Sequence, residues 1–158
     1  MRPTLFCVSL VLAVAACETS TDPFIGFDGT GGLSQTQADG NWSFTVTPAG
    51  PLACAGGSLA AGQVLTAQLD VFSDGTLAPA TSFWQNTTVL RPLSGAINLG
   101  TGATLLVMTA SSGSASAMEL QGTMTAAGSF TGTLTDPRAG SSVVFSACTY
   151  TTTGNKTS

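Results

Sequence analysis

Few side chains in this chain could carry out chemistry, and histidine is absent from the sequence. A Ser-His-Asp or Cys-His relay and most zinc sites need an imidazole, so the composition excludes these classes of site. Asp70 and Glu119 are the acidic residues expected on strands, and each alternates opposite to apolar neighbours. We expect both to face solvent, which leaves no carboxylate pair for catalysis and no dense acidic loop for a metal. The sequence therefore predicts a protein that is not an enzyme and has no cofactor.

Cys17 stands at the end of an apolar run. The run from Thr4 to Ala16 follows a single charge at Arg2 and ends in Val14-Ala15-Ala16-Cys17. It has the basic start, the short apolar core and the small cleavage-site residues of a secretory signal, and it is too short to cross a bilayer. An ordinary signal peptide that is cut near Ala16, with Cys17 merely the next residue, is the alternative interpretation of this segment.

The segment Val14-Ala15-Ala16-Cys17 also resembles the lipobox of bacterial lipoproteins, whose cysteine receives the lipid. The resemblance implies that residues 1–16 are a signal peptide and that the mature chain begins at Cys17. Acyl chains such as palmitate would then hold it, since each buried methylene contributes about 0.8 kcal/mol and two or three chains anchor durably. Glu18 favours the outer membrane. The expected location is the bacterial envelope, on the periplasmic face or the cell surface.

Cys54 and Cys148 remain once Cys7 leaves with the signal and Cys17 carries lipid. In an oxidising envelope compartment, the simplest interpretation of two such cysteines is one disulfide. In the chain-entropy description, a bridge that closes so long a loop stabilises the fold by roughly 4 to 5 kcal/mol. Two free thiols or a metal site are the alternatives.

The charge of the chain restricts its partners. The formal net charge is −4 at pH 7, and only four residues are Lys or Arg. An acidic and sparsely charged protein lacks the basic surface that binds nucleic acid or anionic lipid headgroups. We therefore expect no nucleic-acid partner, and contact with the membrane only through the lipid anchor.

The mature chain divides into a tether, one domain and a tail. Residues 17–39 are rich in Thr, Ser, Gly, Gln and Asp and contain several breakers, which predicts a flexible tether. The domain is predicted to span residues 40–152. The polar residues 153–158 are expected to form a disordered tail.

The domain has the pattern of an all-β protein. β-branched and aromatic residues dominate, breakers recur at short intervals, and no segment keeps a helical period. Strands are predicted at residues 42–47, 65–71, 76–83, 88–90, 95–99, 103–110, 115–125, 129–135 and 142–151, with Asp74-Gly75 as a hairpin turn. Such a series fits an antiparallel meander that closes into a small β-barrel, or alternatively a β-sandwich. The glycines between Gly122 and Gly132 favour the barrel, because glycine lets an opposing aromatic ring pack closely.

Gly40-Asn41-Trp42 opens the first predicted strand and resembles the Gly-x-Trp start of the lipocalins and related calycins. In that family the Trp closes one end of an eight-stranded barrel beneath an Arg from a late strand, and Arg138 is the conceivable counterpart. The chain departs from the family pattern because Arg138 follows an Asp136-Pro137 turn and no mid-chain Thr-Asp signature is recognisable. The resemblance implies an apolar cavity for one small hydrophobic ligand.

The candidates for lining such a cavity are large side chains, most of them expected to point inward. They are Trp42, Phe44, Leu69, Trp84, Met118, Phe130 and Arg138. An eight-stranded barrel can equally be filled by its own side chains, so an ordinary core is the alternative. Phe83-Trp84-Gln85-Asn86 places two adjacent aromatics at a strand end, so at least one is expected to point outward, where it could contact a sugar or a protein.

Two functions follow from these expectations. The first is non-enzymatic binding, either of a small hydrophobic ligand inside the barrel or of an envelope protein at its rim. The second is a structural or adhesive role, in which a filled core supports protein or glycan contacts around Trp84. A cavity inside the sheet favours the first function, whereas a solid core with an exposed aromatic patch favours the second.

Overall fold

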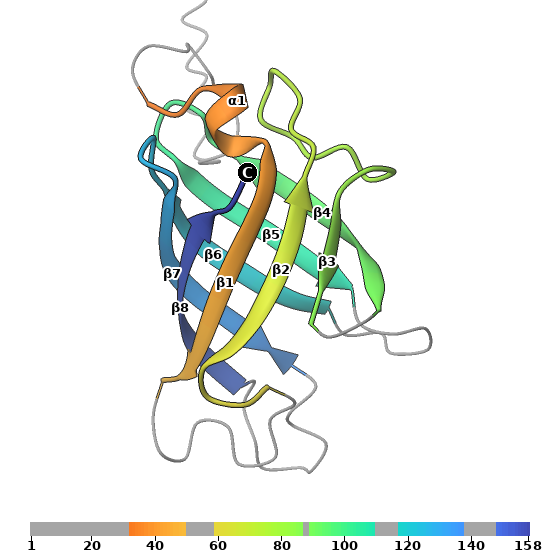
Figure 1. The fold of residues 1–158 in the computed structure, drawn as a ribbon, viewed down its shortest axis with the longest axis vertical. Helices are drawn as coiled ribbons and strands as arrows, with labels where there is room; N and C mark the ends of the chain where they lie inside the picture. Colours follow the sequence, from red (N-terminus) through yellow and green to blue (C-terminus); the bar gives the residue numbers. More distant parts are fainter. Residues whose placement is uncertain (1–31, 50–58, 87–88, 110–116, 138–147) are drawn as a thin grey trace, which may run out of the picture.

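A computed structural model of the chain describes residues 32–49, 59–86, 89–109, 117–137 and 148–158. The elements within these ranges are α1 (Gln35–Ala38), β1 (Gly40–Pro48), β2 (Gln63–Leu69), β3 (Phe83–Gln85), β4 (Leu90–Ile97), β5 (Ala103–Thr109), β6 (Ala117–Met124), β7 (Ser129–Asp136) and β8 (Cys148–Lys156). Each strand pairs antiparallel with the next, and β8 pairs with β1, so the sheet closes into a barrel (Figure 1). The predicted all-β antiparallel barrel is confirmed, and the sandwich alternative is wrong.

Alternation along β1 decides which side chains face the barrel axis. Trp42, Phe44 and Val46 are buried, whereas the residues between them belong to the outer face. Phe44 is paired with Leu65 on β2 and with Gly154 on β8. Because side chains alternate along a strand with a period of two, paired residues project to the same face and meet inside the barrel.

Glycines allow the aromatic rings to lie close to the barrel wall. A Cβ atom built on Gly122 or Gly132 would lie 2.5 or 2.7 Å from the Cζ atom of Phe130. One on Gly154 would lie 2.6 Å from the Cδ1 atom of Phe44. The rings of Phe44 and Phe130 meet edge to face with their centroids 5.2 Å apart, which is a favourable geometry for an aromatic pair. The glycines therefore supply the space that this pair fills.

The helix α1 differs from the flexible tether that the sequence predicts for residues 17–39. It begins after Ser34, whose side chain and backbone form a capping box with Gln37. Leu33 and Ala38 are buried in the same cluster as the barrel core. Figure 1 shows α1 across one end of the barrel. This part of the predicted tether belongs to the domain, because its apolar side chains are buried against the core.

β8 extends beyond residue 152, where the sequence predicts the end of the domain. It continues to Lys156 and pairs with β1 on one side and β7 on the other. Most of the disordered tail predicted at residues 153–158 is therefore strand. Composition suggests fraying because the segment is polar, but two neighbouring strands supply backbone hydrogen bonds that an isolated chain end lacks.

The segment after β2 forms a turn but not the strand predicted at residues 76–83. The carboxylate of Asp74 accepts hydrogen bonds from the backbone N–H and the hydroxyl of Thr76, and Gly75 has a φ of 84°. Glycine adopts this left-handed conformation without a steric penalty. Further pairing is limited to isolated bridges. Pro79 lacks the N–H that a ladder needs, and β3 forms only after it.

Candidate functional site

The barrel interior contains the side chains predicted to line a ligand cavity. Those within the described ranges are at most 1% exposed: Trp42, Phe44, Leu69, Trp84, Met118 and Phe130. The ring of Trp42 stacks on that of Phe44 with their centroids 6.1 Å apart. All six belong to one cluster of buried residues. The inward placement of Trp42, Phe44, Leu69, Met118 and Phe130 is as predicted. Trp84, expected at the centre of an exposed aromatic patch, is instead buried in the core, so that patch is absent from the described part of β3.

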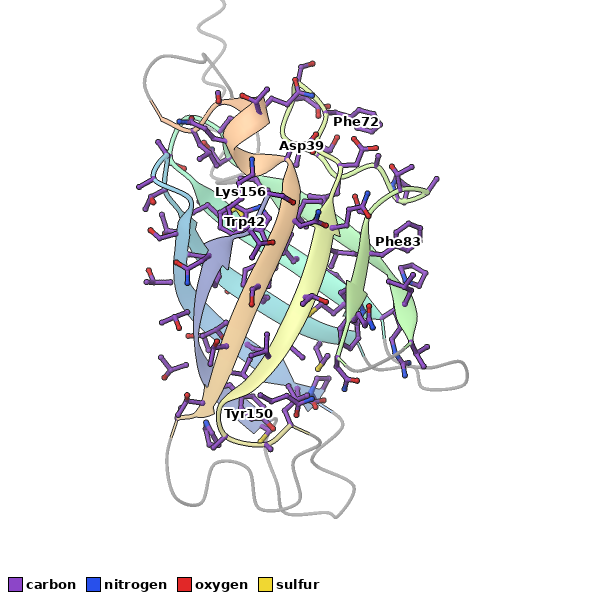
Figure 2. The ribbon with its side chains drawn as sticks, viewed as in Figure 1. Asp39, Trp42, Phe72, Phe83, Tyr150 and Lys156 are labelled. Atoms are coloured by element: carbon purple, nitrogen blue, oxygen red, sulfur yellow. The ribbon has the colours of Figure 1, made fainter. Side chains whose placement is uncertain are left out.

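Trp42 lies near the barrel end that α1 covers (Figure 2). Its indole Nε1–H donates a buried hydrogen bond of 2.8 Å to the carbonyl oxygen of Ala38. The Nζ atom of Lys156 donates to the carbonyl oxygen of Thr36 at 2.7 Å. A buried indole N–H needs such a partner, so α1 both covers Trp42 and satisfies it.

An arginine contacts a tryptophan, but the pair differs from the one that the lipocalin resemblance implies. The guanidinium carbon of Arg91 lies 5.7 Å from the centroid of the Trp84 ring, within the range of a cation–π contact. Arg138, the expected partner of Trp42, lies outside the described residues. Since Trp84 is buried, the aromatic of this strand that reaches the outer face is Phe83.

Asp136 is a buried carboxylate at the end of β7, where the sequence predicts a turn. Its exposed fraction is 0%, and it is paired with Cys148 on β8. The Sγ atom of Cys148 lies 3.4 Å from the hydroxyl oxygen of Tyr150, which Figure 2 places at the barrel end away from α1. The alternation that puts Phe130 and Leu134 inside extends to Asp136. That period of two is the sequence signal that identifies it.

Three of the predicted site residues lie outside the described residues. They are Cys17, Cys54 and Arg138, and the predicted signal at residues 1–16 lies outside as well. Lipidation of Cys17 and the disulfide between Cys54 and Cys148 therefore stay predictions. Cys148 is fully buried on β8, a position compatible with a structural rather than a reactive cysteine.

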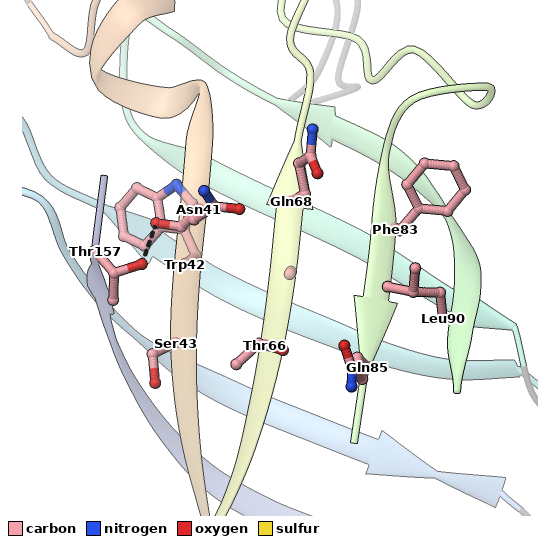
Figure 3. A pocket seen from close by; sticks show the side chains of 10 residues that line it. Asn41, Trp42, Ser43, Thr66, Gln68, Phe83, Gln85, Leu90 and Thr157 are labelled. Atoms are coloured by element: carbon pink, nitrogen blue, oxygen red, sulfur yellow. Dashed lines mark hydrogen bonds between the residues drawn. The ribbon is translucent and has the colours of Figure 1, made fainter. Parts of the chain in front are cut away.

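A groove of about 470 Å³ lies on the outside of the barrel (Figure 3). We call it the outer groove, and its lining residues are Asn41, Trp42, Ser43, Thr66, Ala67, Gln68, Phe83, Gln85, Leu90 and Thr157. Most of them are the outward-facing residues of strands whose inward-facing residues form the core. Figure 3 shows Phe83 and Leu90 side by side at one edge of the groove. None of the lining residues is charged.

Strand register arranges the outer groove as two rows that cross the sheet. The first row contains Asn41, Gln68 and Phe83, and the second contains Ser43, Thr66, Gln85 and Leu90. Each row runs from polar side chains on β1 and β2 to an apolar side chain on β3 or β4. The outer groove could not be predicted from the sequence, because these neighbours are set by pairing between distant segments. The prediction that at least one of Phe83 and Trp84 points outward was the one sign of it in the sequence.

The clearest electrostatic feature in the described part of the chain is at Asp74, which lies in the turn after β2. The pKa of Asp74 is lowered because the hydroxyl of Thr76, and then its backbone N–H, donate hydrogen bonds to the carboxylate. Among the described residues, no three acidic or cysteine side chains are grouped to hold a metal ion. No helix within the described ranges is long and apolar enough to span a membrane.

The closed eight-stranded antiparallel barrel is compatible with a lipocalin-like fold. The stretch Gly40-Asn41-Trp42 opens β1, and Trp42 lies at one end of the barrel, as that resemblance implies. A fold supports many functions, so function has to be argued from the surfaces of this molecule. Comparison of the chain with protein-family models, curated proteins and solved structures gave no match.

Proposed function

We propose that this protein is a lipid-anchored lipoprotein of the bacterial outer membrane and that it binds a partner on the outer face of its barrel. In this proposal the barrel is a rigid support filled by its own side chains, and the outer groove makes the contact. The role is binding without chemical conversion. A small hydrophobic ligand inside the barrel is the rival proposal.

The packing of the barrel interior is the observation that carries this proposal. The largest fully buried side chains include Trp42, Trp84, Tyr150, Phe44 and Phe130. Trp42 and Tyr150 lie toward opposite ends of the barrel (Figure 2), and the ring of Phe44 packs against those of Trp42 and Phe130. An eight-stranded barrel is just wide enough to be filled in this way, and protein interiors are close-packed. Filling by aromatic rings favours a core over a ligand cavity.

The hollows formed by described residues support the same proposal. The outer groove lies on the side wall of the barrel, and hollows of about 350 and 260 Å³ lie at the end covered by α1. Ligand sites are usually preformed concave surfaces of roughly 300 to 1,000 Å³. The outer groove is the largest of these three hollows and falls well within that range.

The lipid anchor is proposed from Val14-Ala15-Ala16-Cys17. The described domain begins at Gly32, on the segment that leads into α1. An anchor upstream of Gly32 would join the domain at the barrel end that α1 covers. The outer groove, on the side wall, would then stay accessible to an envelope partner.

Metabolic labelling with a palmitate analogue tests the anchor. In a bacterial host, the full chain should take up the label and sediment with membranes, whereas Cys17→Ser should lose both properties. Cys7→Ser is the matched control, because Cys7 lies inside the predicted signal and should leave labelling unchanged. Equal labelling of the natural chain and Cys17→Ser, or no labelling of either, would contradict a lipid anchor at this cysteine.

Site-specific photo-crosslinking in living cells tests the binding surface. A photoreactive phenylalanine in place of Thr66 or Gln85, both in the outer groove, should give discrete crosslinked species. The same side chain in place of Thr133 or Thr151, on the outer face of β7 and β8, is the control and should give only background. The proposal fails if the groove positions give no discrete product or if both faces react alike.

A further inference from the structure

The lining of the outer groove combines three kinds of outward side chain. The hydroxyls are those of Ser43, Thr66 and Thr157, the amides are those of Asn41, Gln68 and Gln85, and the apolar side chains are those of Phe83 and Leu90. Trp42 and Ala67 are buried core residues beneath them. The outer groove is thus a mainly polar surface with one apolar edge.

The uncharged lining narrows the class of ligand. Recognition of a phosphate, a carboxylate or an ammonium group normally uses a side chain of opposite charge. The outer groove offers none, since its ten lining residues are all neutral. Amide and hydroxyl side chains each present donors and acceptors together. They therefore match a ligand whose own polar groups are hydroxyls, which also donate and accept.

Phe83 and Leu90 add an apolar contact beside these polar rows. Leu90 is 65% exposed and Phe83 is half-buried, so both present apolar surface to water. Burying such surface contributes about 25 cal/mol for each Å². A pyranose ring has C–H groups on its faces and hydroxyls on its rim. One face can pack on the ring of Phe83 while the rim hydroxyls reach the amide and hydroxyl rows.

The polar side chains of the outer groove are well placed for a ligand. Those of Ser43, Thr66 and Gln68 make no hydrogen bond with any described residue. The Nδ2 atom of Asn41 donates to the hydroxyl oxygen of Ser158 at 2.8 Å, which fixes the direction of that amide. β1 and β2 are paired on both sides, so these side chains stand on a rigid sheet. A preorganised surface loses less entropy on binding.

We infer that the outer groove binds a neutral oligosaccharide. A sugar ring packs on Phe83, and its hydroxyls bond to Thr66 and Gln68. The first row crosses three strands and the second crosses four, so further sugars along a linear chain follow the rows toward Asn41 and Ser43. This inference rests on the proposed function, which places binding at this surface, and adds the class of ligand.

An oligosaccharide array tests the inference with the full lipidated chain in detergent. The probes are linear hexasaccharides of glucose, mannose, galactose and N-acetylglucosamine, and a hexasaccharide of galacturonate is the charged comparison. At least one neutral series should bind more tightly than the acidic one. Binding by none of the neutral series, or tighter binding of galacturonate, would overturn the inference.

Binding measurements on variants of the outer groove then test where the sugar binds. Phe83→Ser and Gln68→Ala should each weaken binding by about ten-fold or more, whereas Phe83→Tyr should keep most of it because the ring remains. Thr133→Ala, on the outer face of β7, is the control and should leave binding unchanged. If Phe83→Ser and Gln68→Ala bind like the natural chain, the sugar lies elsewhere and the inference is wrong.

The two experiments separate failure of the inference from failure of the proposed function. If the photoreactive side chain at position 66 or 85 crosslinks to a protein and the array shows no binding, the outer groove remains the binding surface but its ligand is not an oligosaccharide. No crosslinks together with a negative array would overturn both. Array binding that depends on Phe83, together with glycan-bearing crosslinks, is the result that we expect.

Discussion

Phe44 and Gly154 show how one small residue lets the barrel hold a large one. They are paired on β1 and β8, and a Cβ atom on Gly154 would lie 2.6 Å from Cδ1 and 3.0 Å from Cε1 of Phe44. Both separations are shorter than a van der Waals contact. A close-packed interior cannot take up an extra methyl group without moving its neighbours. The ring therefore fits this barrel because the facing residue has no side chain.

We expect Gly154→Ala to lower the free energy of unfolding by about 1 to 3 kcal/mol, the usual cost of overpacking. In a Phe44→Leu background the same change should cost less, because the smaller side chain leaves room for the methyl group. Urea unfolding of the single and double variants, followed by tryptophan fluorescence, gives both costs. An equal cost in the two backgrounds would show that the ring of Phe44 is not the obstacle.

Asp74 offers a test by titration, because its turn depends on the ionised carboxylate. Hydrogen bonds from Thr76 lower the pKa of Asp74. Any stability that this group contributes is therefore fully present above its unfolded pKa of about 3.9 and is lost as the pH falls through the lower folded pKa. NMR titration of the carboxyl carbon should give a pKa below about 3.9.

Two threonine variants provide the comparison for this titration. Thr76→Val removes the hydroxyl donor and should raise the pKa of Asp74, whereas Thr123→Val, on the outer face of β6, should leave it unchanged. If Thr76→Val leaves the pKa of Asp74 where it is, the assigned cause is wrong.

At the scale of elements, α1 is too short to be stable by itself. A helix of four residues completes hardly more than one turn, and isolated helices of that length do not persist in water. The capping box of Ser34 and Gln37 satisfies its first N–H groups. The barrel supports it further: Trp42 and Lys156 donate hydrogen bonds to its carbonyl oxygens, the Nε2 atom of Gln35 donates to the carbonyl oxygen of Val71, and Ala38 is buried in the core. α1 is therefore a cover whose stability depends on the barrel.

Shortening the chain tests the contribution of α1. A chain that begins at Gly40 loses the buried side chains of Leu33 and Ala38 and the acceptor of the Trp42 indole. Its free energy of unfolding should fall by about 2 kcal/mol or more. Chains that begin at Glu18 and at Gly32 are the controls and should be equally stable. If all three chains unfold at the same urea concentration, α1 adds nothing to the fold.

The elements that could be predicted are those whose signal is local. Trp42, Phe44 and Val46 alternate with polar residues, and this pattern alone predicts the strand and its inner face. α1 carries no such period because it is so short. Residues 88–90 and 95–99 were expected as two separate strands, but β4 runs without interruption from Leu90 to Ile97, with Gly95 at a φ of 138° inside it.

The candidate site was predictable only in part, for the same reason. The inward positions of Met118 and Phe130 follow from alternation, and so does that of Asp136, which the Asp-Pro turn pattern concealed. The outer groove depends on Gln68 lying opposite Phe83, a pairing across the long loop between β2 and β3. Register of this kind is decided by the packing of the whole sheet, and no short stretch of sequence contains it.

At the scale of the whole molecule, the two faces of the barrel carry different kinds of side chain. Its inner face holds the aromatic and aliphatic side chains, and its outer face over β1 to β4 holds neutral polar side chains with an apolar edge. The formal net charge of −4 leaves little electrostatic attraction for nucleic acid or anionic surfaces. This division suits the proposed role, in which a rigid barrel holds one contact surface.

Native mass spectrometry tests most directly whether the barrel is filled by its own side chains. Residues 18–158 would be exported to an oxidising periplasm, purified gently and compared with the denatured chain. We predict the bare mass of the chain in both states, lighter only by the hydrogens lost in a Cys54–Cys148 disulfide. A discrete excess mass that solvent extraction removes would reveal a hydrophobic ligand inside the barrel, and it would contradict the filled core on which the proposed function depends.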